Sequence, residues 1–345
     1  MAARISRRAI IGAGAGLSLL SLMPRTARAA VAAPIIDTHL HLSRGLHRRE
    51  SLGPAVTVAL KAMDAHGVER AIVTPPPFPP GHPGLYGISE ITAAIRGQKR
   101  FAFMAGGDTL NPLLQAIAAA SVTDDAVKRF TAAAERIAAA GAAGFGELAA
   151  EHFSSGRGNH PYESAPPDHP LLLALADVAA RHGMPIELHM EAVQQDMPFP
   201  PNRKQPADPA ALLANIARLE TLLGHNAQAR IVWVHAGWDL TGERTPALMR
   251  SLLERHANLF MSVKIAASGT PMTAPFLAGG STIRPGWIEM LRAFPERFVI
   301  GSDQFIDEGE ELLDAARRFV DALPADLQAA IANGNAPKIY RLAAA

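Results

Sequence analysis

The chain has 345 residues, of which 48% are hydrophobic and 19% are charged, and its formal net charge is +1. A chain of this length and composition can bury a large core, and one α/β barrel would use nearly all of it. The absence of cysteine excludes disulfides, thiolate nucleophiles and cysteine-ligated metals, so any metal site must use nitrogen and oxygen ligands.

The beginning of the chain has the order of an export signal. Arginines precede an apolar stretch over residues 9–23, and small residues follow up to Ala29. The letters SRRAII, residues 6–11, resemble a twin-arginine signal, which implies export of the folded protein to the periplasm. The apolar stretch is short and rich in glycine and alanine, so we expect cleavage near Ala29 and no stable membrane anchor. The predicted domains are therefore a signal peptide over residues 1–29 and one barrel over residues 30–345.

Charge limits the partners of the mature chain. The signal segment carries five of the 33 Lys and Arg residues and none of the 32 Asp and Glu residues, so its removal would change the formal charge from +1 to −4. A mildly acidic chain offers no surface that neutralises phosphates, so we expect no nucleic-acid partner. The expected partners are a small-molecule substrate and the twin-arginine export machinery, and a homo-oligomer is one option for its assembly.

The stretch PIIDTHLHL, residues 34–42, predicts a strand with two imidazoles on one face. Asp37, His39 and His41 alternate, and alternate residues of a strand point to the same side. Neutral imidazole is the commonest protein ligand for zinc, and two nitrogens one strand repeat apart can bind the same ion. An isolated HxH pair also occurs in half-buried strands where the histidines only form hydrogen bonds, so the rest of the chain must decide.

Strands and helices alternate through the rest of the chain. Further strands are predicted at residues 70–74, 101–105, 142–148, 185–190, 230–237, 259–264 and 297–303. Helices are predicted at residues 54–65, 88–97, 124–140, 170–182, 208–223, 245–256 and 285–294, with terminal helices within 324–342. Eight such units predict a closed (β/α)₈ TIM barrel with C-terminal covering helices. A doubly wound sheet is the alternative, but no GxGxxG turn follows the first strand.

Six side chains that bind metals or transfer protons fall at the carboxyl ends of predicted strands, where barrels of this kind carry their sites. They are His39, His41, Glu147, His189, His235 and Asp303. Histidines near helix ends, such as His182 and His256, are interpreted as structural, because a cation there offsets the helix dipole.

The motifs HxH, GFGEL, PIELHM, VWVHAG and IGSD, in this order, resemble those of the amidohydrolase superfamily. The ending NGNAPKIYRL, residues 333–342, looks like the closing helix of its amidohydrolase-related branch. The resemblance implies a metal-dependent hydrolase barrel in which His235 lies beside a divalent ion. The ligands that it implies for this ion are His39, His41, His189 and Asp303.

The expected reaction follows from this site. Zinc, the expected ion, lowers the pKa of bound water towards about 7 and polarises a carbonyl. Asp303 would accept the proton of that water and pass it to the leaving group, unless it is only a helix N-cap. His235 would stabilise the developing oxyanion or act as a further ligand. Glu147 decides the metal count: as a bridge it would hold two ions, and as a residue that only orients a ligand it would leave one.

Three residues are candidates for substrate contacts. Lys264 ends a strand and would fix a substrate carboxylate or carbonyl, although a lysine at the rim can also reach solvent. Trp238 would form an apolar wall, and Arg44 is an anion-binding candidate on a rim loop. Glu187 and Glu191 share the strand face of His189, and we expect one to be buried and paired and the other to meet solvent.

Two further functions fit the same residues. A metal-dependent decarboxylase of the same branch would need a basic pocket for an acidic substrate. A barrel without catalytic activity would serve as a periplasmic binding protein.

Overall fold

The computed structural model describes residues 33–43, 52–155, 160–266, 276–278 and 281–342. The predicted signal peptide and Arg44 lie outside these residues. Within the described ranges, no helix is long and apolar enough to cross a membrane.

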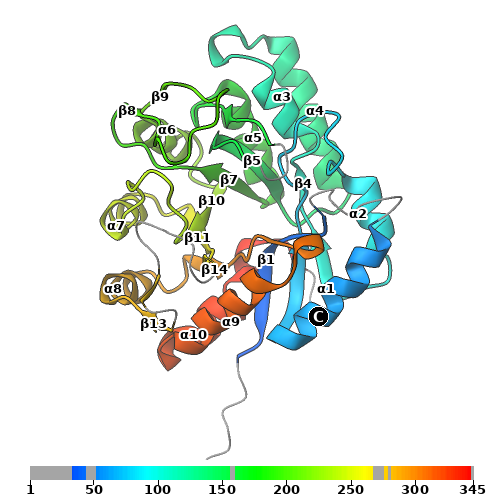
Figure 1. The fold of residues 1–345 in the computed structure, drawn as a ribbon. Coiled ribbons are helices and arrows are strands. Elements are labelled where there is room, and N and C mark those ends of the chain that lie inside the picture. Colours follow the sequence, from blue (N-terminus) through cyan, green and yellow to red (C-terminus); the bar gives the residue numbers. More distant parts are fainter. Residues whose placement is uncertain (1–32, 44–51, 156–159, 267–275, 279–280, 343–345) are drawn as a thin grey trace, which may run out of the picture. The chain divides into compact units, whose positions relative to one another are not determined.

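The centre of the fold is a ring of parallel strands (Figure 1). Strands that follow one another along the chain pair in parallel, except at one junction between two short strands, and the last strand pairs with the first. The strands are β1 (Ile35–His41), β2 (Val68–Val73), β3 (Phe101–Phe103), β4 (Ala105–Gly106), β5 (Phe145–His152), β7 (Pro185–Met190), β10 (Arg230–Ala236), β11 (Leu259–Val263) and β14 (Phe298–Ile300).

The ring closes through β3 and β4, which are two parts of one extended segment. β3 pairs with β2, β4 pairs with β5, and only Met104 separates them. The amide of Met104 donates to the carbonyl of Val73 at 2.9 Å, and the amide of Ala143 donates to the carbonyl of Phe103 at 2.8 Å. The predicted (β/α)₈ TIM barrel is therefore confirmed, with β3 and β4 together as its third strand.

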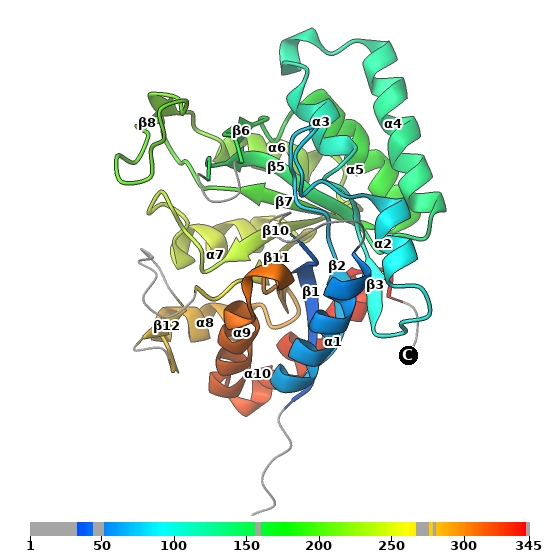
Figure 2. The same cartoon turned by 45° about the vertical axis from the view of Figure 1, so that its right-hand side comes forward.

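Helices lie around the outside of the strands, as Figures 1 and 2 show. They are α1 (Gly53–His66), α2 (Ile88–Ala94), α4 (Asp124–Ala139), α5 (Pro170–His182), α6 (Ile216–His225), α7 (Pro246–Arg255), α8 (Pro285–Ala293) and α9 (Glu311–Ala322). Short elements in the connections are α3 (Leu110–Gln115), η1 (Ala119–Ser121), β6 (Glu163–Ser164), β8 (Met197–Pro198), β9 (Ala211–Leu212), β12 (Leu277–Ala278), β13 (Thr282–Ile283), β15 (Gln304–Phe305) and η2 (Ile306–Glu308).

Local sequence explains where several helices begin and end. The hydroxyls of Thr123 and Thr245 cap α4 and α7 by accepting hydrogen bonds from backbone amides of the first turn. Gly67 and Gly183 end α1 and α5 in the left-handed conformation, with φ of 66° and 59°. Because glycine adopts this conformation without steric cost, the ends of both helices were readable from the sequence.

The prediction of a helix over residues 208–223 is wrong at its start. Residues 211–212 form β9, which pairs with β8 in a hairpin, and α6 begins only after Asn215. The side chain of Asn215 accepts from the amide of Val193 at 3.0 Å and donates to the carbonyl of Glu191 at 2.8 Å. The chain before α6 is thereby tied to the segment after β7 and cannot continue the helix.

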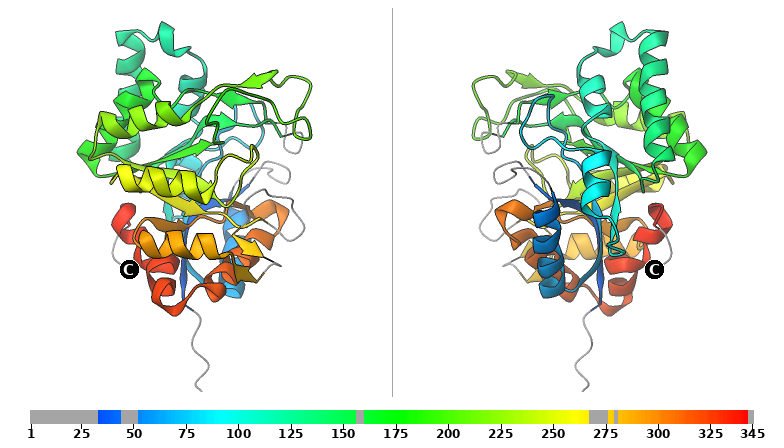
Figure 3. Two further views of the ribbon diagram at one scale, coloured as in Figure 1. Left: turned by 90° about the vertical axis from the view of Figure 1, so that its left-hand side faces the viewer. Right: turned by 90° about the vertical axis from the view of Figure 1, so that its right-hand side faces the viewer.

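The interior of the barrel is apolar at the amino ends of the strands. We call this group the amino-end layer, and it consists of Ile36, Ile72, Met104, Val232 and Val299. The C-terminal segment, made of α10 (Ala325–Ala329), a π-helical turn η3 (Ala330–Gly334) and α11 (Ala336–Ile339), closes this end. In the left panel of Figure 3 this red segment lies at the left, opposite the green loops that follow β7.

Candidate metal centre

The barrel brings the six predicted strand-end residues to one end of the ring. β1 supplies His39 and His41, β5 supplies Glu147, β7 supplies His189 and β10 supplies His235, while Asp303 follows β14. All are buried except His189, which is partly exposed.

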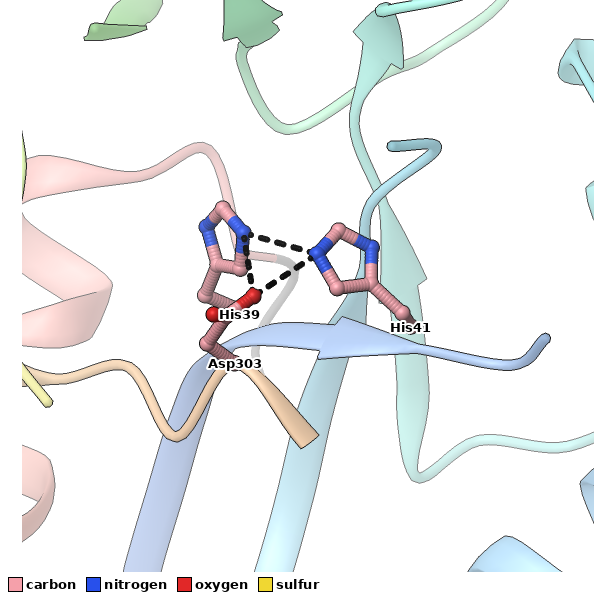
Figure 4. Close-up of side chains that lie close together, drawn as sticks. All are labelled: His39, His41 and Asp303. Carbon is pink, nitrogen blue, oxygen red and sulfur yellow. Dashed lines mark hydrogen bonds and ion pairs between the residues drawn. The ribbon is translucent and has the colours of Figure 1, made fainter. Parts of the chain in front are cut away.

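His39, His41 and Asp303 form a first group (Figure 4). The Nε2 atoms of the two histidines are 3.1 Å apart. Oδ1 of Asp303 lies 3.0 Å from Nε2 of His41 and 3.7 Å from Nε2 of His39. Since Zn–N and Zn–O bonds are about 2.0–2.2 Å long, three donor atoms this close together can share one ion.

The hydrogen-bond partners of the Nδ1 atoms of His39 and His41 determine whether their Nε2 atoms can act as ligands. Nδ1 of His39 lies 2.6 Å from a carboxylate oxygen of Glu187, and Nδ1 of His41 lies 2.7 Å from the carbonyl oxygen of Thr74. Both partners only accept, so both Nδ1 atoms carry a hydrogen and donate. In neutral rings the two Nε2 lone pairs would then face each other, which is favourable only with a proton or a cation between them.

The carboxylates around His39 stabilise a positive charge at this position. Burial lowers the pKa of His39, but Glu187 and Glu147 outweigh burial and raise it well above its usual value. The raised pKa of His39 favours a positive charge among these carboxylates, and a divalent ion bound there would supply such a charge. The donor set therefore fits a metal ion.

Glu147 lies between two pairs of histidines. Its Oε2 is 3.4 Å from Nε2 of His39 and 3.7 Å from Nε2 of His41. Its Oε1 is 2.7 Å from Nδ1 of His189 and 3.1 Å from Nε2 of His235. Burial raises the pKa of Glu147, but the charge of His39 and hydrogen bonds from the histidines hold it well below its usual value.

Three of the four histidines fall into two overlapping candidate metal-holding groups. His39, Glu147 and His235 form a second possible metal-holding set, whereas His189 belongs to neither set and contacts the centre through Glu147. The structure thus separates His189 from the predicted ligands His39 and His41 by one carboxylate.

Lys264 and Trp238 lie beside Asp303. The ammonium of Lys264 forms an ion pair with Oδ2 of Asp303 and lies 3.8 Å from the centre of the Trp238 ring. Burial raises the pKa of Asp303, but Lys264 and the histidines hold it well below its usual value. Of the three predicted substrate-contact residues, the two that the structure describes line the cavity, and Lys264 is also an orienting partner of the predicted catalytic carboxylate.

The backbone is unusual at the two predicted catalytic residues. His235 has φ of 64° and Asp303 has φ of 58°, in a region that residues other than glycine seldom adopt. Such conformations persist only where the surroundings enforce them, and they gather at functional sites. Asp303 caps no described helix, since α9 begins only at Glu311, so the N-cap alternative is wrong.

Asp37 holds the turn that carries Asp303. Its carboxylate accepts from the amide of His39 at 3.1 Å and from the amide and hydroxyl of Ser302 at 2.9 Å and 2.5 Å. The amide of Asp303 in turn donates to the carbonyl of His39 at 2.9 Å. The DxHxH alternation was the signal in the sequence, but its partner Ser302 lies 265 residues away along the chain.

Glu187 and Glu191 differ from the expectation that one would meet solvent. Both are buried. Glu187 accepts a hydrogen bond from His39, and Glu191 accepts one from the amide of Leu240 at 3.0 Å. Sequence reasoning also missed Thr74, which contributes through a backbone carbonyl, and Tyr340, which hydrogen-bonds Glu187.

A cavity of about 250 Å³ opens onto the candidate metal centre. Its outer wall is mostly aromatic, imidazole and apolar. This wall includes Phe78, His152, Phe153, His160, Arg203, Trp238 and Leu240.

Comparisons with known proteins agree with this geometry. A family model described as Amidohydrolase matches residues 36–342. No curated protein matches the chain. A probable 2-pyrone-4,6-dicarboxylic acid hydrolase from Acinetobacter baumannii, solved with citric acid bound, has a similar fold, with TM-score 0.50, 15% identity and coverage of 88% of this chain and 98% of that chain. A 2,6-dihydroxybenzoate decarboxylase in complex with 2,6-dihydroxybenzoate gives TM-score 0.51, 14% identity and coverage of 90% and 99%.

At these identities the solved structures show the fold alone, whereas the family model spans nearly all of the described chain. The protein therefore belongs to the amidohydrolase family.

Proposed function

We propose that the protein is a metal-dependent hydrolase that acts on a small ester, lactone or amide. The observation that carries the proposal is the position of Glu147, whose two oxygens face different pairs of histidines. One carboxylate between two cations is an arrangement typical of hydrolytic sites, whereas a single cation also suits decarboxylation. We therefore propose two ions, with zinc as the first candidate because the ligands are imidazoles and carboxylates.

When bound, the ions supply Lewis-acid activation of water and of the substrate carbonyl. His39, His41 and Asp303 would hold one ion, His189 and His235 the other, and Glu147 both. Asp303 is the proton acceptor, because Lys264 keeps it ionised, and it later donates that proton to the leaving group.

His235 acts as a neutral imidazole. Burial lowers its pKa to about 3, and its Nδ1 has no hydrogen-bond partner among the described residues. A neutral ring can hold a metal through the lone pair of Nε2 while Nδ1 carries the hydrogen. The small cavity limits the substrate to about one ring or a short chain.

Decarboxylation is the second candidate function, and one observation favours it. Arg203 lines the cavity, and Glu147 and Asp303 are the sole carboxylates among the described lining residues. An acidic substrate would therefore meet a cationic side chain and no opposing charge outside the metal centre.

The test is a screen of zinc-loaded and manganese-loaded protein against lactones, aryl esters, small amides and aromatic carboxylic acids. Hydrolysis products, together with two ions per chain by elemental analysis, are the expected result. Release of carbon dioxide without hydrolysis would replace the proposal by the decarboxylase. Tight binding without turnover of any compound would favour a binding protein.

We also propose export to the periplasm by the twin-arginine machinery, supported by the order of residues 1–29. Replacing Arg7 and Arg8 with lysine should leave the full-length precursor in the cytoplasm, as fractionation of cells that express the full chain would show. Unchanged export of that variant would contradict the proposal.

A further inference from the structure

We propose that Tyr340, from the C-terminal segment, is a positioning residue of the metal centre and acts on His39 through Glu187. The inference rests on the proposed metal-dependent function and adds to it a contribution from the opposite end of the barrel.

A short chain of hydrogen bonds carries the proposal. The hydroxyl of Tyr340 donates to Oε1 of Glu187 at 2.5 Å, and Nδ1–H of His39 donates to Oε2 of the same carboxylate at 2.6 Å. Nε2 of His39 then points at Asp303 and His41. Tyr340 is 2% exposed, and Glu187 and His39 are 0% exposed.

Burial gives these bonds their importance. A carboxylate in a dry interior needs a donor on each oxygen, and hydrogen bonds to an ionised group are short and strong. With both oxygens held, Glu187 has one orientation, and it fixes the plane and the tautomer of the His39 ring. Without the hydroxyl, Oε1 would be left buried with one donor fewer, and Glu187 would relax away from His39.

The fold explains why the hydroxyl reaches so far. Tyr340 ends α11 and packs against the amino-end layer inside the barrel. The segment is anchored by the amide of Arg341, which donates to the carbonyl of Ala143 at 3.1 Å, and by Arg230, which donates to the carbonyl of Ile339 at 3.3 Å. The C-terminal segment thus closes the amino end of the barrel, and the Tyr340 hydroxyl extends from it to the carboxylate of Glu187.

The chain offers a matched control. Tyr162 lies beside another buried glutamate, Glu151, and none of the hydrogen bonds or ion pairs of the described residues joins Glu151 to His39. Tyr162→Phe therefore removes a tyrosine hydroxyl beside a buried glutamate and leaves the contacts of His39 unchanged.

The experiment compares full-length wild type, Tyr340→Phe and Tyr162→Phe, each stripped of metal by chelator dialysis. Zn²⁺ affinity is measured by competition with a chromophoric chelator, and the absorption spectrum is recorded after Co²⁺ loading. We expect Tyr340→Phe to bind Zn²⁺ about 10- to 100-fold more weakly and to change the Co²⁺ spectrum, which is the usual effect of removing an outer partner of a ligand. Tyr162→Phe should match wild type in both, even where the two variants lose similar thermal stability.

Equal Zn²⁺ affinity and equal Co²⁺ spectra of wild type and Tyr340→Phe would overturn the inference and leave the proposed function intact. Failure of the wild-type protein to bind Zn²⁺ would instead contradict both the proposed metal-dependent function and the inference about Tyr340. Should Tyr340→Phe not fold, Glu187→Gln decides, because it keeps the shape and removes the charge that links Tyr340 to His39. Wild-type Zn²⁺ affinity in Glu187→Gln would contradict the relay.

Discussion

The two ends of the barrel interior differ sharply in chemistry although the same strands build both. The amino-end layer is apolar and is closed by the C-terminal segment. The carboxyl end gathers four histidines, two carboxylates and a lysine at the candidate metal centre, which opens onto one cavity. Packing stabilises the first end without any ligand, whereas the second assembles charges that a cation must balance. The amino-end layer thus contributes mainly packing, and the carboxyl end contributes the candidate ligands.

The largest effect is expected when a candidate metal ligand at the carboxyl end is removed. His39→Ala should abolish metal binding in the first group and lower turnover by about 1000-fold or more, because both the ion and the anchor of Glu187 are lost. Metal content and turnover are the measurements. His182→Ala is the control, since His182 pairs with Glu135 on the outside of the barrel, and it should retain both.

A smaller effect should separate chemistry from metal binding. Asp303→Asn keeps the size and one donor oxygen but cannot accept a proton, so turnover should fall by about 100- to 10,000-fold while the metal content stays near that of wild type. Elemental analysis and steady-state kinetics on a hydrolysed substrate provide the check. Undiminished turnover would show that another group carries the proton.

The amino-end layer should respond in the opposite way. Met104→Ala removes a fully buried side chain from this layer and should lower the free energy of unfolding by about 2–5 kcal/mol. Zn²⁺ affinity of the folded protein should stay within about twofold of wild type, because no ligand contact is lost. Urea unfolding of metal-free protein and chelator competition measure the two quantities. A large loss of affinity would mean that the two ends are coupled by packing.

The least change is expected at Glu163, which lies beyond the metal centre and accepts from Asn111 at 2.8 Å. Burial raises its pKa from 4.5 to about 7. The folded state therefore binds a proton more tightly than the unfolded state, so this group's contribution to stability is present below about pH 4.5 and is lost as the pH rises through about 7. Glu163→Gln should gain about 1–3 kcal/mol over wild type at pH 8 and less at pH 5. Urea unfolding at both pH values tests this, and an equal difference at both would contradict it.

Much of this molecule is readable from its sequence because strong local signals coincide with element boundaries. Strand 185–190 and helix 170–182 match the structure residue for residue, since a proline opens each of them and Gly183 ends the helix. The strand-end rule brought together residues far apart in the chain, such as His41 and Asp303, which are separated by 262 residues, because the barrel places all carboxyl ends on one side.

What the sequence hides is the partner of each polar group. The carbonyl of Thr74 leaves no trace in the letters of the chain, and the pairing of Tyr340 with Glu187 joins positions 153 residues apart. The sequence places Lys264 at a strand end and suggests a substrate contact. It does not show the ion pair with Asp303, because that pairing depends on side-chain direction. The late start of α6 was missed for a similar reason, since Asn215 acts on residues after β7.

The closure of the ring joins the first strand to the C-terminal segment. The first strand contributes His39, and Tyr340, from the C-terminal segment, hydrogen-bonds the carboxylate that contacts it. Asn333 also bonds the carbonyl of Pro34 at 3.0 Å, so the beginning and the end of the barrel meet. Until the C-terminal segment has docked, the amino end of the barrel stays open and Glu187 lacks the donor that fixes it on His39, so we expect ordering of the metal centre to follow that docking.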